Sequence, residues 1–197
     1  MSLGLPYSGP VHRAYRGIND TLWAAYRRGE VSQPDLARER FRRLLREIGG
    51  QPRLAPRLGE TYLDRLSLRG DRLPGCRPLL TKLRGEYRLG VVTNGIDRVQ
   101  RSRLEVSGLA PFFEVVVTSQ GCGYAKTDPR ILQVALEALA VSPRQALYVG
   151  DDVATDGGAA AAAGVPFCWV DDGAQPNGRR PRRRVSSLQE LGARLLP

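Results

Sequence analysis

The strongest constraint on the fold is an alternation of short apolar segments and helical segments that begins after Gly75. The apolar segments predict β-strands because they are rich in β-branched and aromatic residues and end in turn-forming residues. Helical periodicity fills the intervals between them. Such alternation is typical of an α/β fold with a parallel sheet covered by helices on both faces. The predicted strands are Tyr87–Val92, Phe112–Val117, Ala146–Val149 and Pro166–Val170.

The chain before this alternation contains helical patterns and no convincing strand. In its second helical segment, apolar residues recur at helical spacing and form one stripe. Ser32 is a plausible N-cap for that segment, and Gly49 follows its end. This part therefore predicts a small all-helical unit. Its predicted helices are Val11–Arg28, Gln33–Ile48 and Ala55–Leu68.

Composition supports a globular chain, with 42% hydrophobic and 25% charged residues. No apolar run approaches the roughly 18 residues that a membrane-spanning helix needs, so we expect no membrane partner. The first residues lack a basic start followed by an apolar block, so we expect no secretory signal there. The three cysteines form no C-x-x-C pair, which favours a reducing cytoplasm. The expected parts are an N-terminal tail (1–10), the helical unit (11–73) and the α/β core (74–197).

The positive charge invites a nucleic-acid interpretation. The formal net charge is +10, yet only two of the thirty basic residues are lysines. Five arginines lie within Arg179–Arg184, and no aromatic residues alternate with them to stack on bases. We therefore expect a solvated basic face with one arginine-rich loop, and no nucleic-acid partner. The role of that loop and the oligomeric state stay open.

Polar residues gather where the predicted strands end. Ligands of parallel sheets bind beyond the carboxyl ends of the strands, so these residues are candidates for a site. Thr93, Asn94 and Gly95 follow the first strand and offer a hydroxyl, an amide and backbone N–H groups to an anionic oxygen. The same three residues are also consistent with an ordinary turn.

Two further features lie at later strand ends. Lys126, one of the two lysines, precedes a predicted helix and could neutralise an anion, or be a solvated surface residue. Asp151, Asp152 and Asp156 crowd around a strand-to-helix turn. Carboxylates this close repel each other unless a cation compensates, and Mg²⁺ prefers oxygen ligands. The alternative is that Asp152 caps the helix and the other two are solvated.

Together these elements resemble the haloacid dehalogenase-like hydrolase superfamily, most of whose members are Mg²⁺-dependent phosphatases. Thr93 matches the second motif of that family, Lys126 the third, and Asp151 with Asp156 the fourth. The helical unit looks like the cap of the branch that contains bacterial pyrimidine-nucleotide and acylneuraminate phosphatases. The resemblance implies a Rossmann-like core with a helical cap, Mg²⁺ as cofactor, and a small phosphate monoester, such as a nucleotide, as substrate.

The resemblance also implies roles for individual residues. Thr93 and Lys126 would act in catalysis by holding the phosphoryl group. The implied phosphate-binding residues are Thr93, Asn94, Gly95 and Lys126. The implied metal residues are Asp151, as a ligand, and Asp156, which orients the metal shell, with Asp152 as an optional third.

The family's first motif, D-x-D-x-T at the end of an apolar strand, is absent from this sequence. Its first Asp attacks phosphorus and its second acts as acid and base, so both roles lack a residue here. The segment Ile18–Trp23 contains the sequence D-T-L, which resembles the end of that motif. Gly17 and Asn19, however, stand at the two positions that the motif's carboxylates would occupy. We therefore expect that this chain, as written, does not hydrolyse phosphate esters. Either its true start lies upstream, which the other motifs favour, or it is a decayed relative.

In the family, the motif-bearing strand lies in the middle of the sheet, between the strand that ends at Asn94 and the strand that ends at Gly150. Without it, two inner edges carry unpaired backbone groups, which is costly. Two other functions stay open. One is a non-catalytic relative that binds phosphate, Mg²⁺ or a partner through the same strand ends. The other is a nucleic-acid binder that uses Arg179–Arg184.

Overall fold

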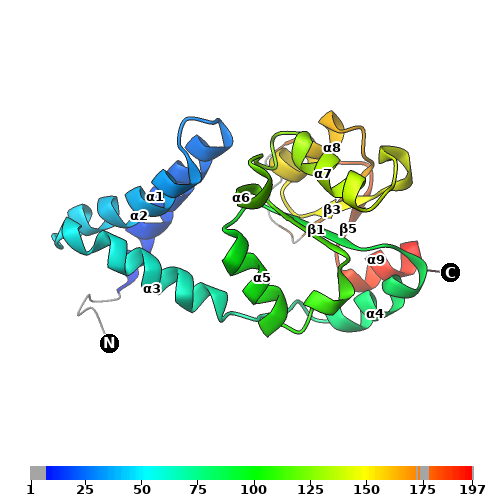
Figure 1. Ribbon diagram of the computed structural model, residues 1–197, viewed down its shortest axis with the longest axis horizontal. Coiled ribbons are helices and arrows are strands. Elements are labelled where there is room, and N and C mark those ends of the chain that lie inside the picture. The colour runs from blue at the N-terminus through cyan, green and yellow to red at the C-terminus, as the bar shows by residue number, and fades with distance from the viewer. Residues whose placement is uncertain (1–7, 172, 174–177, 197) are drawn as a thin grey trace. The chain divides into compact units, whose positions relative to one another are not determined.

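The computed structural model divides the chain into two compact units, which are coloured along the chain in Figure 1. The helical unit is Met1–Leu66, and the sheet unit is Ser67–Pro197. Residues 1–7 of the expected tail lie outside the described residues. The structure describes residues 8–171, 173 and 178–196.

The helical unit confirms the three predicted helices, each within two residues at both ends. Helices α1 and α2 lie side by side, and Leu22 and Leu45 are fully buried (Figure 1). Ser32 caps α2, since its hydroxyl oxygen accepts a hydrogen bond from the Asp35 N–H at 3.2 Å. The segment Ile18–Trp23 lies inside α1, so it is helix and not a motif-bearing strand. The elements are α1 (Gly9–Arg27), α2 (Gln33–Glu47), η1 (Pro52–Leu54) and α3 (Ala55–Ser67).

The sheet unit confirms the predicted alternation of strands and helices. Its strands are β1 (Gly90–Thr93), β2 (Val115–Thr118), β3 (Tyr148–Gly150), β4 (Phe167–Val170) and β5 (Arg184–Val185). Its longer helices are α4 (Cys76–Glu86), α5 (Asp97–Val106), α7 (Arg130–Ala138) and α9 (Leu188–Leu195). Its short helical segments are η2 (Ala110–Phe112), α6 (Ser119–Cys122), η3 (Pro143–Gln145), η4 (Val153–Gly157) and α8 (Gly158–Ala162).

All paired strands run parallel, and they form two ladders. β1 pairs with β2, while β3 pairs with β4 and β4 with β5. Alternate side chains of β4 point to opposite faces, because Phe167 joins the core under α7 and α8 whereas Cys168 joins the core under α9. Helices therefore cover both faces of this strand, and within each ladder the strand ends point the same way.

Strands β1 and β3 are less buried than β2 and β4, the strands with which they pair. β1 and β3 contain no buried residue, whereas β2 and β4 each contain two. Strands of a parallel sheet are normally most buried in its interior. The reversal arises because, within the part of the chain that the structure describes, no ladder joins β1 to β3. One edge of each strand is therefore left open.

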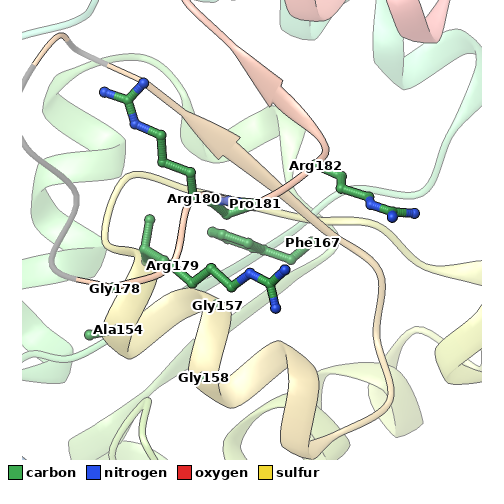
Figure 2. Close-up of a pocket in the computed structure, with 10 residues that line it drawn as sticks. Ala154, Gly157, Gly158, Phe167, Gly178, Arg179, Arg180, Pro181 and Arg182 are labelled. Carbon is green, nitrogen blue, oxygen red and sulfur yellow. The ribbon is translucent and has the colours of Figure 1, made fainter.

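The structure adds one strand that the sequence analysis missed. Arg184 was assigned to a loop, but with Val185 it forms β5 beside β4. Two residues are too few for a period-2 pattern to be visible in a sequence. Residues 178–182, which precede β5, line an open cavity of about 710 Å³ together with η4 and the start of β4 (Figure 2).

None of the described helices combines the length and the hydropathy needed to cross a membrane. All three cysteines are unpaired. Burial raises the pKa of the Cys76 and Cys168 thiols, so neither is an activated thiolate.

The open edge of β3 can be tested by amide hydrogen exchange. The Tyr148 N–H donates to the Pro166 carbonyl of β4 at 2.9 Å, so the next N–H, that of Val149, points to the opposite, open edge. We expect the Val149 amide to exchange at least about tenfold faster than the Tyr148 amide under native conditions. Equal protection of the two amides, measured by NMR, would contradict the open edge.

Candidate functional site

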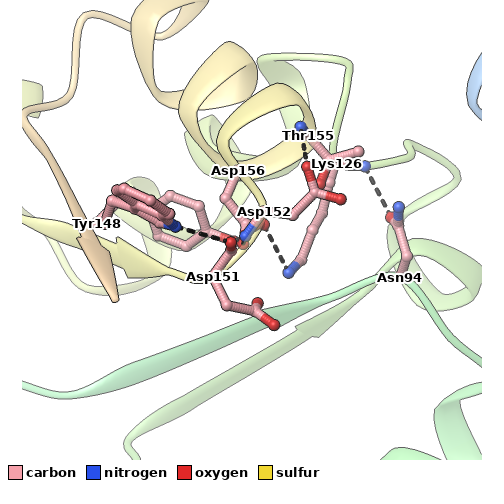
Figure 3. A network of polar contacts seen from close by, with 8 residues as sticks. Asn94, Lys126, Tyr148, Asp151, Asp152, Thr155 and Asp156 are labelled. Atoms are coloured by element: carbon pink, nitrogen blue, oxygen red, sulfur yellow. Dashed lines mark hydrogen bonds and ion pairs between the residues drawn. The ribbon is translucent and has the colours of Figure 1, made fainter. Parts of the chain in front are cut away.

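Lys126 connects the end of β1 to the segment after β3. Its backbone N–H donates to Asn94 Oδ1 at 2.7 Å, and its ammonium group lies 2.8 Å from Asp156 Oδ1 (Figure 3). The side chain of Lys126 is 20% exposed, so it is held in place yet open to a ligand. Three residues that the sequence analysis placed at separate strand ends thus meet at one site. An ammonium group has three donors, so Lys126 can bind an anion as well as Asp156.

Asp156 is the buried centre of this network, with only 1% of its side chain exposed. Oδ1 accepts hydrogen bonds from Lys126 Nζ and from the Tyr148 hydroxyl at 3.3 Å. Oδ2 accepts from the Asp152 N–H at 3.2 Å. Both oxygens are therefore engaged within the protein. In this arrangement Asp156 positions the Lys126 ammonium.

Tyr148 is a member of the site that the sequence analysis missed, since it lies inside a predicted strand. Its hydroxyl donates a hydrogen bond to Asp156 Oδ1. Burial, together with the negative charge of Asp156, raises the pKa of Tyr148 well above its ordinary value. The hydroxyl therefore stays protonated and serves as a hydrogen-bond donor.

Gly150 provides the space that Asp156 occupies. A Cβ atom at Gly150 would lie 2.3 Å from Asp156 Oδ2, which no real contact allows. The absence of a side chain at the end of β3 is what lets the carboxylate fold back against the strand. Gly150 is therefore part of the site, although it contributes no chemical group.

Asp151 and Asp152 have different environments. Asp152 caps η4, since its Oδ1 accepts from the Thr155 N–H at 2.9 Å, and the capping alternative is confirmed for this residue. Asp151 is exposed, and its carbonyl oxygen accepts from Trp169 Nε1 at 3.0 Å, which fixes its backbone. Its carboxylate points away from these contacts (Figure 3). Asp151 is thus the residue best placed to ligate a cation.

The residues present fit a mostly hydrated Mg²⁺. The described residues include no group of three His, Cys, Asp or Glu side chains that could hold a metal ion. Mg²⁺ keeps several waters and is commonly bound through one or two carboxylates plus substrate phosphate. The exposed carboxylate of Asp151 suits that mode of binding, whereas the described residues do not form an all-protein metal cage.

The turn after β1 differs in part from the expectation. Thr93 ends β1, and within the described residues its hydroxyl has no protein partner, so it is available to an anion. The Gly95 N–H, in contrast, donates to the buried Ser119 Oγ at 3.1 Å and is not available to a ligand. Gly95 is also packed tightly, since a Cβ atom there would lie 2.5 Å from Gln100 Nε2. Its role is to shape the turn and not to bind phosphate.

Hydrogen bonds also join the end of β2 to the start of α5, next to the turn after β1. Thr118 Oγ1 donates to Asp97 Oδ1 at 2.9 Å, and the Asp97 N–H donates to Gln120 Oε1. The hydrogen bond from Arg101, together with that from Thr118, lowers the pKa of Asp97. These contacts connect the end of β2 to the start of α5, the helix that follows β1.

Comparisons with known proteins show which family this chain is similar to. The family described as haloacid dehalogenase-like hydrolase matches residues 38–170. The chain is 33% identical to the pyrimidine 5'-nucleotidase YjjG of Escherichia coli over 90% of this chain and 79% of that protein. It is 36% identical to the phosphoserine phosphatase of Thermus thermophilus over 87% of this chain and 72% of that protein.

A solved structure is similar over nearly the whole chain. The crystal structure of the YfnB protein of Bacillus subtilis bound to magnesium has a TM-score of 0.88 and 28% identity. The match covers 97% of this chain and 85% of that one.

Substitution of Gly150 tests whether the site depends on its packing against Asp156. We expect Gly150→Ala to lower the free energy of unfolding by about 2 kcal/mol, since the added methyl group displaces a buried, paired carboxylate. The matched control is Gly158→Ala, because that position is helical and has no atom within 4 Å of the added Cβ. We expect the control to stay within about 1 kcal/mol of the native protein in urea denaturation. Equal losses for the two variants would contradict this account.

Proposed function

We propose that this chain, which belongs to the haloacid dehalogenase-like hydrolase family, holds the phosphoryl group and the metal in Mg²⁺-dependent hydrolysis of a small phosphate monoester. A nucleotide is the candidate substrate, because relatives of this chain include pyrimidine 5'-nucleotidases. The observation that carries the proposal is the partly exposed Lys126 ammonium, which the buried Asp156 carboxylate holds at 2.8 Å.

Each residue of the site has a physical role in this proposal. The Lys126 ammonium would balance the charge of the phosphate, at a position where partial burial strengthens the attraction. The Thr93 hydroxyl and the remaining N–H donors of Asn94 would orient phosphate oxygens from the opposite strand end. Asp151 would hold Mg²⁺, which supplies additional charge neutralisation at the phosphate when bound. Asp156 and Tyr148 act only by keeping Lys126 in place.

The proposal includes the absence of turnover by this chain alone. No D-x-D-x-T sequence occurs among its 197 residues, so the carboxylates that would attack phosphorus and transfer the proton are missing. The alternative is a non-catalytic protein that binds phosphate and Mg²⁺ with the same residues. Both functions predict phosphate binding. Only the enzymatic function predicts turnover when a peptide that carries the D-x-D-x-T motif is added.

Binding of inorganic phosphate tests the role of Lys126. We expect Lys126→Met to weaken phosphate binding in the presence of Mg²⁺ by at least about tenfold, because a charge-assisted contact is lost. Lys82 is the only other lysine and is exposed, so Lys82→Met is the matched control and should bind as the native protein does. Isothermal titration calorimetry makes the comparison. Equal affinity of the two variants would remove Lys126 from the phosphate site.

Complementation with a peptide tests the missing motif. The chain alone should not hydrolyse p-nitrophenyl phosphate, whereas adding a synthetic apolar strand that ends in D-x-D-x-T should give Mg²⁺-dependent turnover. A control peptide with Asn in place of both Asp residues should bind without turnover, because it lacks the carboxylates. Protection of the Val149 amide reports whether either peptide has docked on β3.

Two outcomes of this experiment count against the proposal. Turnover by the chain alone that Asp151→Ala abolishes would contradict the absence of a nucleophile. A docked D-x-D-x-T peptide that gives no turnover would favour the non-catalytic alternative.

A further inference from the structure

The arginine-rich loop lines a cavity on the far side of η4 from the Asp156 carboxylate. The cavity has a volume of about 710 Å³ and is built from η4, the start of α8, the start of β4 and the segment before β5 (Figure 2). Val153 and Gly157 of η4 line it, while Asp156 of the same segment holds Lys126. Neither the family resemblance nor the phosphate site described above uses this cavity.

Among the described residues that line the cavity, the charged ones are three arginines, Arg179, Arg180 and Arg182. All three are exposed, and within the described parts of the chain none has an ion pair with a carboxylate. Arg184, the first residue of β5, lies 3.7 Å from the Asp171 carboxylate, which balances its charge. Three like charges within four consecutive residues repel each other unless an anion lies between them. The described part of the lining contains no acidic residue, so the charge there favours an anion over a cation.

The floor of the cavity is apolar and tightly packed. A Cβ atom at Gly157 would lie 3.2 Å from the Phe167 ring, and one at Gly178 would lie 3.2 Å from Val153 Cγ1. The absence of side chains at these two glycines lets the loop and η4 approach the ring closely. The charged groups are therefore confined to the rim, where a ligand would meet them first.

The directions of the three side chains indicate the shape of the anion. In Figure 2 the guanidinium groups of Arg180 and Arg182 point away from each other, and that of Arg179 lies near Gly157. A single phosphate group cannot contact three guanidinium groups that are spread around a rim. A chain of linked phosphates can, because each guanidinium binds one phosphate group through a pair of parallel hydrogen bonds.

We propose that the cavity lined by Arg179, Arg180 and Arg182 is a binding site for a small polyphosphate anion. The site is separate from the phosphate site at Lys126. Arginine suits it better than lysine would, since the planar guanidinium matches the geometry of phosphate oxygens.

The test uses inorganic tripolyphosphate as the probe and isothermal titration calorimetry at about 0.15 M salt, where long-range attraction to the net positive charge is screened. We expect the variant Arg179→Gln, Arg180→Gln, Arg182→Gln to bind tripolyphosphate at least about tenfold more weakly than the native protein. The matched control is Arg77→Gln, Arg84→Gln, Arg144→Gln, which removes the same charge from exposed positions of the sheet unit. The control should change the affinity less than about twofold.

Further measurements separate this site from the phosphate site. Tripolyphosphate affinity should persist in Lys126→Met, while orthophosphate affinity falls, so failure of the proposed function leaves this result unchanged. Equal losses in the two arginine variants would show general charge attraction and overturn the proposal. Binding of single-stranded RNA by a chain that does not bind tripolyphosphate would also overturn it, in favour of a nucleic-acid surface.

Discussion

The buried carboxylate of Asp156 is the constraint on which the candidate site depends. An ionised carboxylate that is 1% exposed costs several kcal/mol unless hydrogen bonds and a counter-charge compensate it. The compensation comes from three separate segments, through the Lys126 ammonium, the Tyr148 hydroxyl and the Asp152 N–H. Each donor must therefore be in place before the carboxylate can be buried. The Lys126 ammonium, which would bind phosphate, is therefore held in place because the buried Asp156 carboxylate needs a counter-charge.

This network also replaces a connection that the backbone does not make. Within the described residues, β1 and β3 share no ladder, yet Asn94 after β1 and Asp156 after β3 both bind Lys126. The two ladders also share one core, since Val92 and Tyr148 pack against the same buried cluster. The relative position of the two strand ends thus rests on side chains and packing. We expect the positions of these two strand ends to fluctuate more than they would in a continuous hydrogen-bonded sheet.

Much of the fold could be predicted from the sequence because its signals are local. The three helices of the helical unit follow from their apolar periodicity, and Ser32 was identifiable as a cap from its residue type. Contacts between distant residues could not be read in this way. Nothing near Gly95 reveals that Ser119 takes its N–H, and nothing near Tyr148 reveals its bond to Asp156. A motif predicts which residues meet, whereas burial and packing decide which of their atoms stay free.

The shape of η4 explains how one short segment can serve two surfaces. Its five residues, Val153–Gly157, form a π-helical turn, which is wider than an α-helical one and is common at functional sites. The Asp156 N–H and the Gly157 N–H both donate to the Asp152 carbonyl, at 2.8 Å and 3.3 Å. Asp152 therefore fastens the turn with its backbone and caps it with its side chain. Asp156 binds Lys126 while its neighbour Gly157 packs against Phe167, so the two successive residues of this turn serve different surfaces.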